Sequence, residues 1–215
     1  MALEPTTARG RATRDRILQA AAVLVKERGV ALTTIDAVQE AAGVGRSQMY
    51  HYFDDRDDLM RAVVGATVDA VLADQDVLVK GVDSLADIDR WFAEVVANSW
   101  RQDSVGGCPI GSLASQLAEH DDVTRAAFVT AFERWEAPLI AGLERMQRRG
   151  ELRPDVVVTD LADITMAAIQ GGLLLAQIRR NPDQVRLALE GARAALLPAR
   201  GHSLVSETST ASLVR

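Results

Sequence analysis

Apolar positions recur every three or four residues along almost the whole chain, which is the spacing of one face of an α-helix. The first such segment runs over residues 13–28, with Ile17 and Leu24 on one face and Gly29 as its stop. No stretch alternates apolar and polar residues long enough to predict a strand. The one β-branched run, residues 156–158, directly precedes a helical pattern. The fold class is therefore predicted to be all-α.

The same periodicity predicts eight further helices, separated by Gly, Pro and Asp residues. We expect them near residues 34–41, 46–52, 56 onward, 85–101, 109–119, 122–149, 155–180 and 183–197. The stretch from Ile164 to Ile178 has 15 residues without a charge, and no uncharged stretch of the chain is longer. As a helix it would measure roughly 22 Å, shorter than the roughly 30 Å of a membrane core. It is therefore interpreted as a buried helix, and no membrane partner is expected.

The two short helices near the N-terminus are joined by a tight turn. Thr33 or Thr34 can cap the first of them, and Asp36 lies three residues after Thr33, as a capping box requires. Gly43 lies where the chain must turn, because a residue without Cβ tolerates a left-handed backbone. Such a helix pair is the basis of major-groove recognition, in which the second helix inserts and its N-terminal residues meet base edges. Ordinary core packing is the alternative interpretation.

The second of these helices carries side chains suited to DNA. Arg46 can donate two hydrogen bonds to guanine or bind a phosphate, Gln48 can bond adenine, and Ser47 can bond either base. Tyr50 and His51 have polar tips suited to phosphate oxygens. His51 has a simpler alternative as an exposed polar residue without a contact.

The net charge of −6 by itself argues against nucleic-acid binding, but the charges are unevenly distributed. Residues 1–53 hold seven Arg and Lys against five Asp and Glu, whereas residues 54–215 hold seventeen against twenty-five. Four arginines, at positions 9, 11, 14 and 16, face only Asp15. A basic N-terminal arm on an acidic body fits a protein that presents one end to phosphates.

Residues 13–64 resemble the TetR family of transcriptional regulators. The resemblance rests on a Thr-Thr helix start, an Ala-Gly-Val turn, a small polar recognition helix and a Tyr-x-x-Phe ending. The match to the motif continues beyond this ending as far as Leu59. It implies a homodimeric repressor that binds palindromic double-stranded operator DNA and is released by an effector. The DNA-binding residues it implies are Arg14, Thr33, Thr34, Arg46, Ser47, Gln48, Tyr50, His51 and Arg56.

Two positions depart from the family pattern. Gly45 replaces the usual Ser, so the recognition helix lacks a side-chain cap. Arg56 stands where the family usually has a phosphate-contacting Lys. It is flanked by aspartates at positions 54, 55, 57 and 58, which suit a helix N-terminus but repel phosphates.

The rest of the chain carries no catalytic constellation, so no enzyme activity, cofactor or metal is expected. The run from His120 to Asp122 is interpreted as a helix boundary with an aspartate cap, with a metal site as the alternative. Cys108 is the only cysteine, which favours a reducing compartment. It is either a small buried hydrophobe or an oxidant sensor. The polar, Arg-rich N-terminus lacks a signal-peptide pattern, so a cytoplasmic location is expected.

Aromatic residues are only 4% of the chain, yet they gather in the predicted body. Their positions indicate either solid core or an apolar cavity for a flat ligand, walled in part by a helix that Pro138 bends. The ligand-binding residues predicted on the second interpretation are Trp91, Phe92, Trp100, Phe128, Phe132 and Trp135, with Gln116, His120, Thr165 and Gln170 as polar groups. Residues 107–118 and 171–176 resemble the LmrA-like branch of the family, which implies a small, planar, hydrophobic effector.

The last two predicted helices are interpreted as the dimer interface. The residues chosen for it are Leu161, Ala168, Gly171, Gly172, Leu175, Leu189, Ala192 and Leu196. Two adjacent glycines in mid-helix are unfavourable unless another backbone packs against them, and a two-fold four-helix interface would explain them. A contact within one chain is the alternative.

These interpretations divide the chain into four parts. They are a flexible basic arm (1–12), a DNA-binding domain (13–55), an effector-binding and dimerisation domain (56–197) and a disordered tail (198–215). Two rival functions remain. One is a helical enzyme or ligand-binding protein that has lost DNA binding, and the other is a repressor without a ligand cavity.

Overall fold

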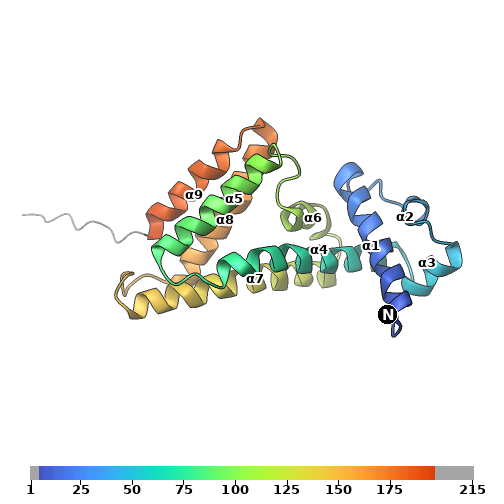
Figure 1. Ribbon diagram of the computed structural model, residues 1–215, viewed down its shortest axis with the longest axis horizontal. Coiled ribbons are helices and arrows are strands. Elements are labelled where there is room, and N and C mark those ends of the chain that lie inside the picture. The colour runs from blue at the N-terminus through green and yellow to red at the C-terminus, as the bar shows by residue number, and fades with distance from the viewer. Residues whose placement is uncertain (1–4, 197–215) are drawn as a thin grey trace, which may run out of the picture.

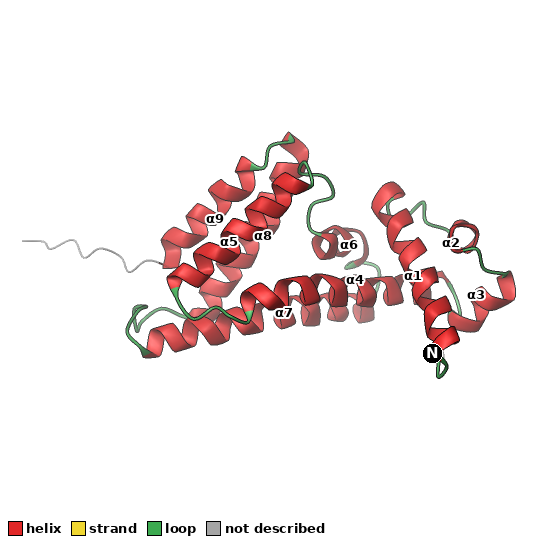
Figure 2. Ribbon diagram, in the orientation of Figure 1, coloured by secondary structure: helices red, strands yellow, loops and turns green. Residues whose placement is uncertain are grey.

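The computed structural model describes residues 5–196, apart from the side chains of residues 76–78. Within this part the chain forms nine helices and no strand, which confirms the all-α prediction (Figure 2). The helices are α1 (Ala8–Arg28), α2 (Ile35–Ala42), α3 (Arg46–Tyr52), α4 (Arg56–Val79), α5 (Leu85–Arg101), α6 (Pro109–Leu117), α7 (Asp122–Arg148), α8 (Val158–Arg179) and α9 (Asp183–Leu196).

The molecule is elongated, with a small head at one end (Figure 1). Helices α1, α2 and α3 form this head, residues 5–55, and the remaining helices form the body, residues 56–196. Helix α4 leaves the head and runs beside α7 along the body, while α5, α8 and α9 lie together at the far end. Helix α6 packs against α4 and α7 at the end of the body that is nearest to α1.

Helix α1 begins five residues earlier than predicted. The hydroxyl oxygen of Thr7 accepts a hydrogen bond from the Gly10 amide at 3.1 Å and caps the helix. Residues 8–12 therefore belong to α1 and are not part of a flexible arm. The sequence prediction missed this turn because residues 8–12 carry no apolar stripe. Residues 1–4 and the predicted tail, 198–215, lie outside the described residues.

The helix-turn-helix forms largely as its local sequence predicts. Thr34 caps α2 by accepting from the Ala37 amide at 3.2 Å, so the predicted capping box between Thr33 and Asp36 does not form. Gly43 adopts the left-handed conformation at the turn, with φ 61° and ψ 41°. The Gly45 amide donates to the Gln48 side-chain oxygen at 3.2 Å, which supplies half of a cap to α3.

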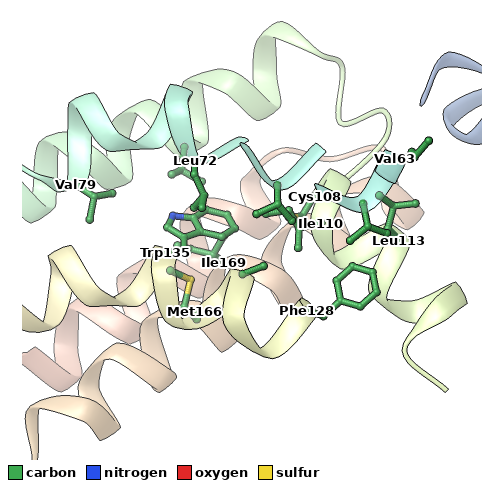
Figure 3. Close-up of a cluster of buried hydrophobic side chains, with 14 of the residues drawn as sticks. Val63, Leu72, Val79, Cys108, Ile110, Leu113, Phe128, Trp135, Met166 and Ile169 are labelled. Atoms are coloured by element: carbon green, nitrogen blue, oxygen red, sulfur yellow. The ribbon is translucent and has the colours of Figure 1, made fainter. Parts of the chain in front are cut away.

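A continuous apolar core runs along the body. Figure 3 shows the indole of Trp135 on α7 lying beside Leu72, Met166 and Ile169, which come from α4 and α8. By length and hydropathy α8 could cross a membrane, but core helices of soluble proteins pass the same test, and α8 packs against α7 and α9.

Candidate functional site

The outer face of α3 is a row of exposed polar side chains at the tip of the head. Arg46, Ser47, Gln48, Tyr50 and His51 are all exposed. Met49 and Tyr52 point into the core, with exposed fractions of 0% and 7%. The structure thus brings together five of the residues predicted to bind DNA, and it places them where a duplex could reach them (Figure 1).

The side chains on this face keep donors available. Gln48 uses only its carbonyl oxygen on the Gly45 amide, so its NH₂ group remains free to donate. The Arg46 guanidinium lies 5.7 Å from the centre of the Tyr50 ring, which steadies it without using its donors on an acceptor. In the described part of the chain Arg46 takes part in no ion pair. Arg14 is half-buried and lies over the Phe53 ring, 5.8 Å from its centre.

Three other residues predicted to bind DNA have structural roles. Thr34 uses its hydroxyl oxygen to cap α2. Thr33 is 1% exposed and its hydroxyl donates to the Gly29 carbonyl at 2.9 Å, so the predicted contact with DNA is wrong for Thr33. Arg56 donates to the carbonyls of Val30 at 2.5 Å and Thr33 at 3.1 Å. The first turn of α4 faces the loop between α1 and α2, and Arg56 holds this loop instead of a phosphate.

The body contains a cavity of about 160 Å³. We call it the body cavity; α4, α5, α7, α8 and the segment 102–109 line it. Its lining mixes apolar residues such as Trp135 and Ile169 with polar ones, and Asp74 is the only charged residue among the described side chains that line it. The indole nitrogen of Trp135 is buried and has no hydrogen-bond partner among the described residues.

Of the ten residues predicted to bind a ligand, only Trp135 lines this cavity. Trp91 is 1% exposed and donates to the Gln75 side chain at 2.9 Å, while Phe128 and Thr165 are buried in the core. Phe92 and the exposed Trp100 lie along a groove between α5 and α9. Phe132 and Gln170 line a separate hollow beside Cys108. The sequence identified aromatic positions but could not distinguish core from cavity wall.

The two remaining predicted ligand residues lie at the junction of head and body. The side-chain oxygen of Gln116 on α6 accepts from the Val30 amide at 2.9 Å. The His120 imidazole lies 3.6 Å from the Asp57 carboxylate at the start of α4. Gln116 and Arg56 thus hold the loop that follows α1, whereas the His120 contact joins the end of α6 to the start of α4. No local sequence signal could have identified them, because the partners are far apart along the chain.

The residues considered as a metal site or an oxidant sensor have local structural roles. Asp121 caps α7, which confirms the predicted helix boundary, and hydrogen bonds from the Thr124 hydroxyl and amide lower the pKa of its carboxyl group. Cys108 is buried at the start of α6, where its sulfur accepts from the Gly111 amide at 3.4 Å. The Gln170 side chain also donates to this sulfur, at 3.5 Å. Cys108 therefore acts as a helix cap and a packing residue in this structure.

The residues predicted for the dimer interface separate into two groups. Leu161, Leu189, Ala192 and Leu196 are at most 6% exposed within the single chain, so they cannot form the interface predicted for them. A Cβ at Gly172 would lie 3.1 Å from the Val185 Cα on α9, so this glycine allows close packing within the chain. On the neighbouring face of α8, Gly171 has open space, Ala168 is partly exposed and Leu175 is 40% exposed.

Comparison with known proteins places both halves of the chain in one family. The model described as "Bacterial regulatory proteins, tetR family" matches residues 17–63. The model described as "Tetracyclin repressor-like, C-terminal domain" matches residues 81–192, which is more than half of the chain.

Individual proteins agree with these matches. An uncharacterised helix-turn-helix transcriptional regulator of Mycobacterium tuberculosis is 29% identical over 177 residues, covering 78% of this chain and 86% of the relative. The transcriptional repressor DhaR of a Mycobacterium species is 25% identical, covering 86% and 92%. The crystal structure of a TetR regulatory protein from Rhodobacter sphaeroides has the same fold, with a TM-score of 0.73, 24% identity and coverage of 86% and 99%. The chain belongs to the TetR family and is a DNA-binding regulator of transcription.

Proposed function

We propose that this chain is a cytoplasmic, homodimeric repressor that holds two α3 helices against a palindromic operator and releases it when a small effector binds. The exposed polar face of α3 at the tip of the head carries the proposal. In this proposal, base edges are read by Arg46, Ser47 and Gln48, because these residues lie in the first turn of the recognition helix. Tyr50 and His51 contact phosphates. Repression is favoured because relatives such as DhaR are named as repressors.

The body cavity is the proposed effector site. A cavity of about 150 Å³ accommodates a molecule the size of benzene, so the 160 Å³ found here limits the effector to about one ring. The resemblance to LmrA-like regulators favours a planar compound. The carboxylate of Asp74 calls for a hydrogen-bond donor on the ring, and the unpartnered indole N–H of Trp135 calls for an acceptor. The predicted small, planar, hydrophobic effector is thereby narrowed to a small aromatic compound with polar substituents.

Helix α4 provides the proposed route from effector to DNA. Its middle lines the body cavity at Val71, Asp74 and Gln75, and its first residue, Arg56, holds the head through the carbonyls of Val30 and Thr33. A ligand that binds one position of α4 more tightly than the other shifts the population of head positions. Operator affinity then falls because the two heads no longer match the spacing of the half-sites.

The proposed dimer face is the exposed apolar stripe of α8 and α9. Its members are large aliphatic side chains that stay exposed in the single chain, namely Ile164, Leu174, Leu175, Ile178 and Leu187. Gly171 and Gly191 lie on the same exposed sides with open space above them, so a second backbone can approach closely. Large exposed apolar side chains gathered on one helix pair are typical of an interface. The proposed interface therefore uses this stripe instead of the buried residues that the sequence predicts.

Replacing Ile178 with arginine is expected to convert the dimer to a monomer while leaving the protomer folded. The Ile178 side chain is 69% exposed, so the charge costs little in the monomer but is buried without a partner in the dimer. Sedimentation or light scattering measures the mass. Val123→Arg is the matched control, because Val123 is also 69% exposed but lies on α7. Equal dissociation of both variants, or of neither, contradicts the proposed face.

The test of the proposed function is to incubate the purified full chain with fragmented DNA from its own genome and to sequence what it retains. We expect an inverted repeat whose half-sites are separated by whole helical turns, and binding that weakens steeply with salt. Retention of no preferred sequence at low salt would show that the chain is not an operator-binding protein.

A further inference from the structure

A second cavity, of about 230 Å³, lies where the head meets the body. We call it the junction cavity. Its walls come from both parts of the molecule, with Ala22, Val25 and Lys26 on α1, Val63 on α4 and Leu113 on α6. It shares Gln102, Gly107 and Pro109 with the body cavity, so the two cavities adjoin at the segment that joins α5 to α6.

The lining of the junction cavity combines an apolar surface with one positive charge. Ala22, Val25, Val63 and Leu113 provide the apolar part, and of the described residues that line the cavity only Lys26 is charged. A Cβ built on Gly106 would lie 3.4 Å from the Lys26 Cε, so the end of this side chain reaches across to the wall formed by the α5–α6 segment. Its ammonium group has no ion pair or hydrogen bond within the described residues.

We propose that the junction cavity is a second ligand site, which takes a small amphipathic anion such as a medium-chain carboxylate. The carboxylate pairs with the Lys26 ammonium, because a charge-assisted hydrogen bond is the strongest interaction this lining offers. The hydrocarbon chain lies against Val25, Val63 and Leu113 and is removed from water. The body cavity has the opposite charge, at Asp74, and repels the same ligand.

The site lies next to the hydrogen bond that joins α6 to the head. This bond runs from the Val30 amide to the side chain of Gln116. Val30 lies four residues after Lys26, and Gln116 lies four residues after Ser112, and both Lys26 and Ser112 line the cavity. In the described part of the chain this is the only hydrogen bond between α6 and residues 5–55. A ligand between α1 and α6 separates the two helices and opens this bond. The regulatory consequence, release of the operator, rests on the proposed function; binding itself does not.

The test uses the full chain and hexanoate, with neutral hexanamide as its size-matched counterpart, in isothermal titration calorimetry. We expect hexanoate to bind and hexanamide to bind about tenfold more weakly, the usual order of a charge-assisted hydrogen bond. Lys26→Gln is expected to lower hexanoate affinity by the same factor and to leave hexanamide unchanged. Asp74→Asn is the control in the body cavity and is expected to leave hexanoate binding unchanged. Hydrogen exchange at the Val30 amide is expected to accelerate when hexanoate binds.

The outcomes separate this site from the proposed function. Hexanoate binding that is absent at millimolar concentration, or that survives Lys26→Gln intact, overturns the proposal. So does tighter hexanoate binding by Asp74→Asn, because removing this negative charge strengthens anion binding only if the anion lies in the body cavity. Because calorimetry and hydrogen exchange need no DNA, they test the junction cavity even if the chain retains no operator. Operator binding by ligand-free Lys26→Gln is expected to equal that of the unmodified chain.

Discussion

Replacing Phe53 with alanine is expected to unfold the head while the body stays folded. Phe53 is 1% exposed and ends α3, where the Arg14 guanidinium covers its ring. Truncating a fully buried Phe typically costs about 3–5 kcal/mol, from lost burial and the cavity that remains. A head of about 50 residues has little stability to lose. Operator binding is therefore expected to disappear in the same variant.

The positions of the tryptophans allow the unfolding of the head and of the body to be measured separately. All three tryptophans, at positions 91, 100 and 135, lie in the body, so their fluorescence reports unfolding of the body alone. Circular dichroism reports all the helices. We expect Phe53→Ala to add an early transition in circular dichroism without moving the fluorescence transition. Tyr50→Ala is the control, because the Tyr50 ring is 45% exposed. An unchanged dichroism curve for Phe53→Ala would contradict a core role.

Replacing Arg46 with alanine is expected to weaken operator binding without changing stability. Arg46 is exposed in the first turn of α3 and has no ion pair among the described residues, so the free protein loses almost nothing. A bidentate contact from arginine to guanine is worth about 1–3 kcal/mol, and a dimer loses it at both half-sites. We expect discrimination to relax at one base pair of each half-site.

Fluorescence anisotropy with operators substituted one base pair at a time, at several salt concentrations, measures this loss. Arg101→Ala removes the same charge from the exposed end of α5 and is expected to leave affinity unchanged. Equal weakening by the two variants would mean that Arg46 acts through net charge alone. If Arg46→Ala weakens all operator variants uniformly, its contact is with phosphate.

The loop after α1 shows why the junction could not be predicted. Arg56 and Gln116 are polar residues on helix surfaces, and by sequence they were assigned to a phosphate and to an effector. Arg56 binds the carbonyl of Val30, 26 residues away, and Gln116 binds the amide of Val30, 86 residues away. Hydrogen bonds of this range have no periodicity and no local motif. Only the packing of α4 and α6 against the end of α1 brings the groups together.

The dimer face illustrates a related limit. Helical spacing correctly identified α8 and α9 as apolar, but both sides of α8 are apolar, and periodicity alone could not say which side packs within the chain. The close approach at Gly172 assigns one face to α9, and the exposed Ile178 marks the free face. Burial within one protomer therefore changed the residues proposed for the interface, although the helices remained the same.

The sequence by itself determined the nine helices, the turn at Gly43 and the polar face of α3. Each depends on residues within a few positions of one another, through caps, backbone freedom and a 3.6-residue period. The tertiary structure decided which aromatic side chains line a cavity, what Arg56 and Gln116 bind, and which side of α8 is free. These depend on contacts between helices distant in sequence, where burial and hydrogen bonding are set by how whole helices pack.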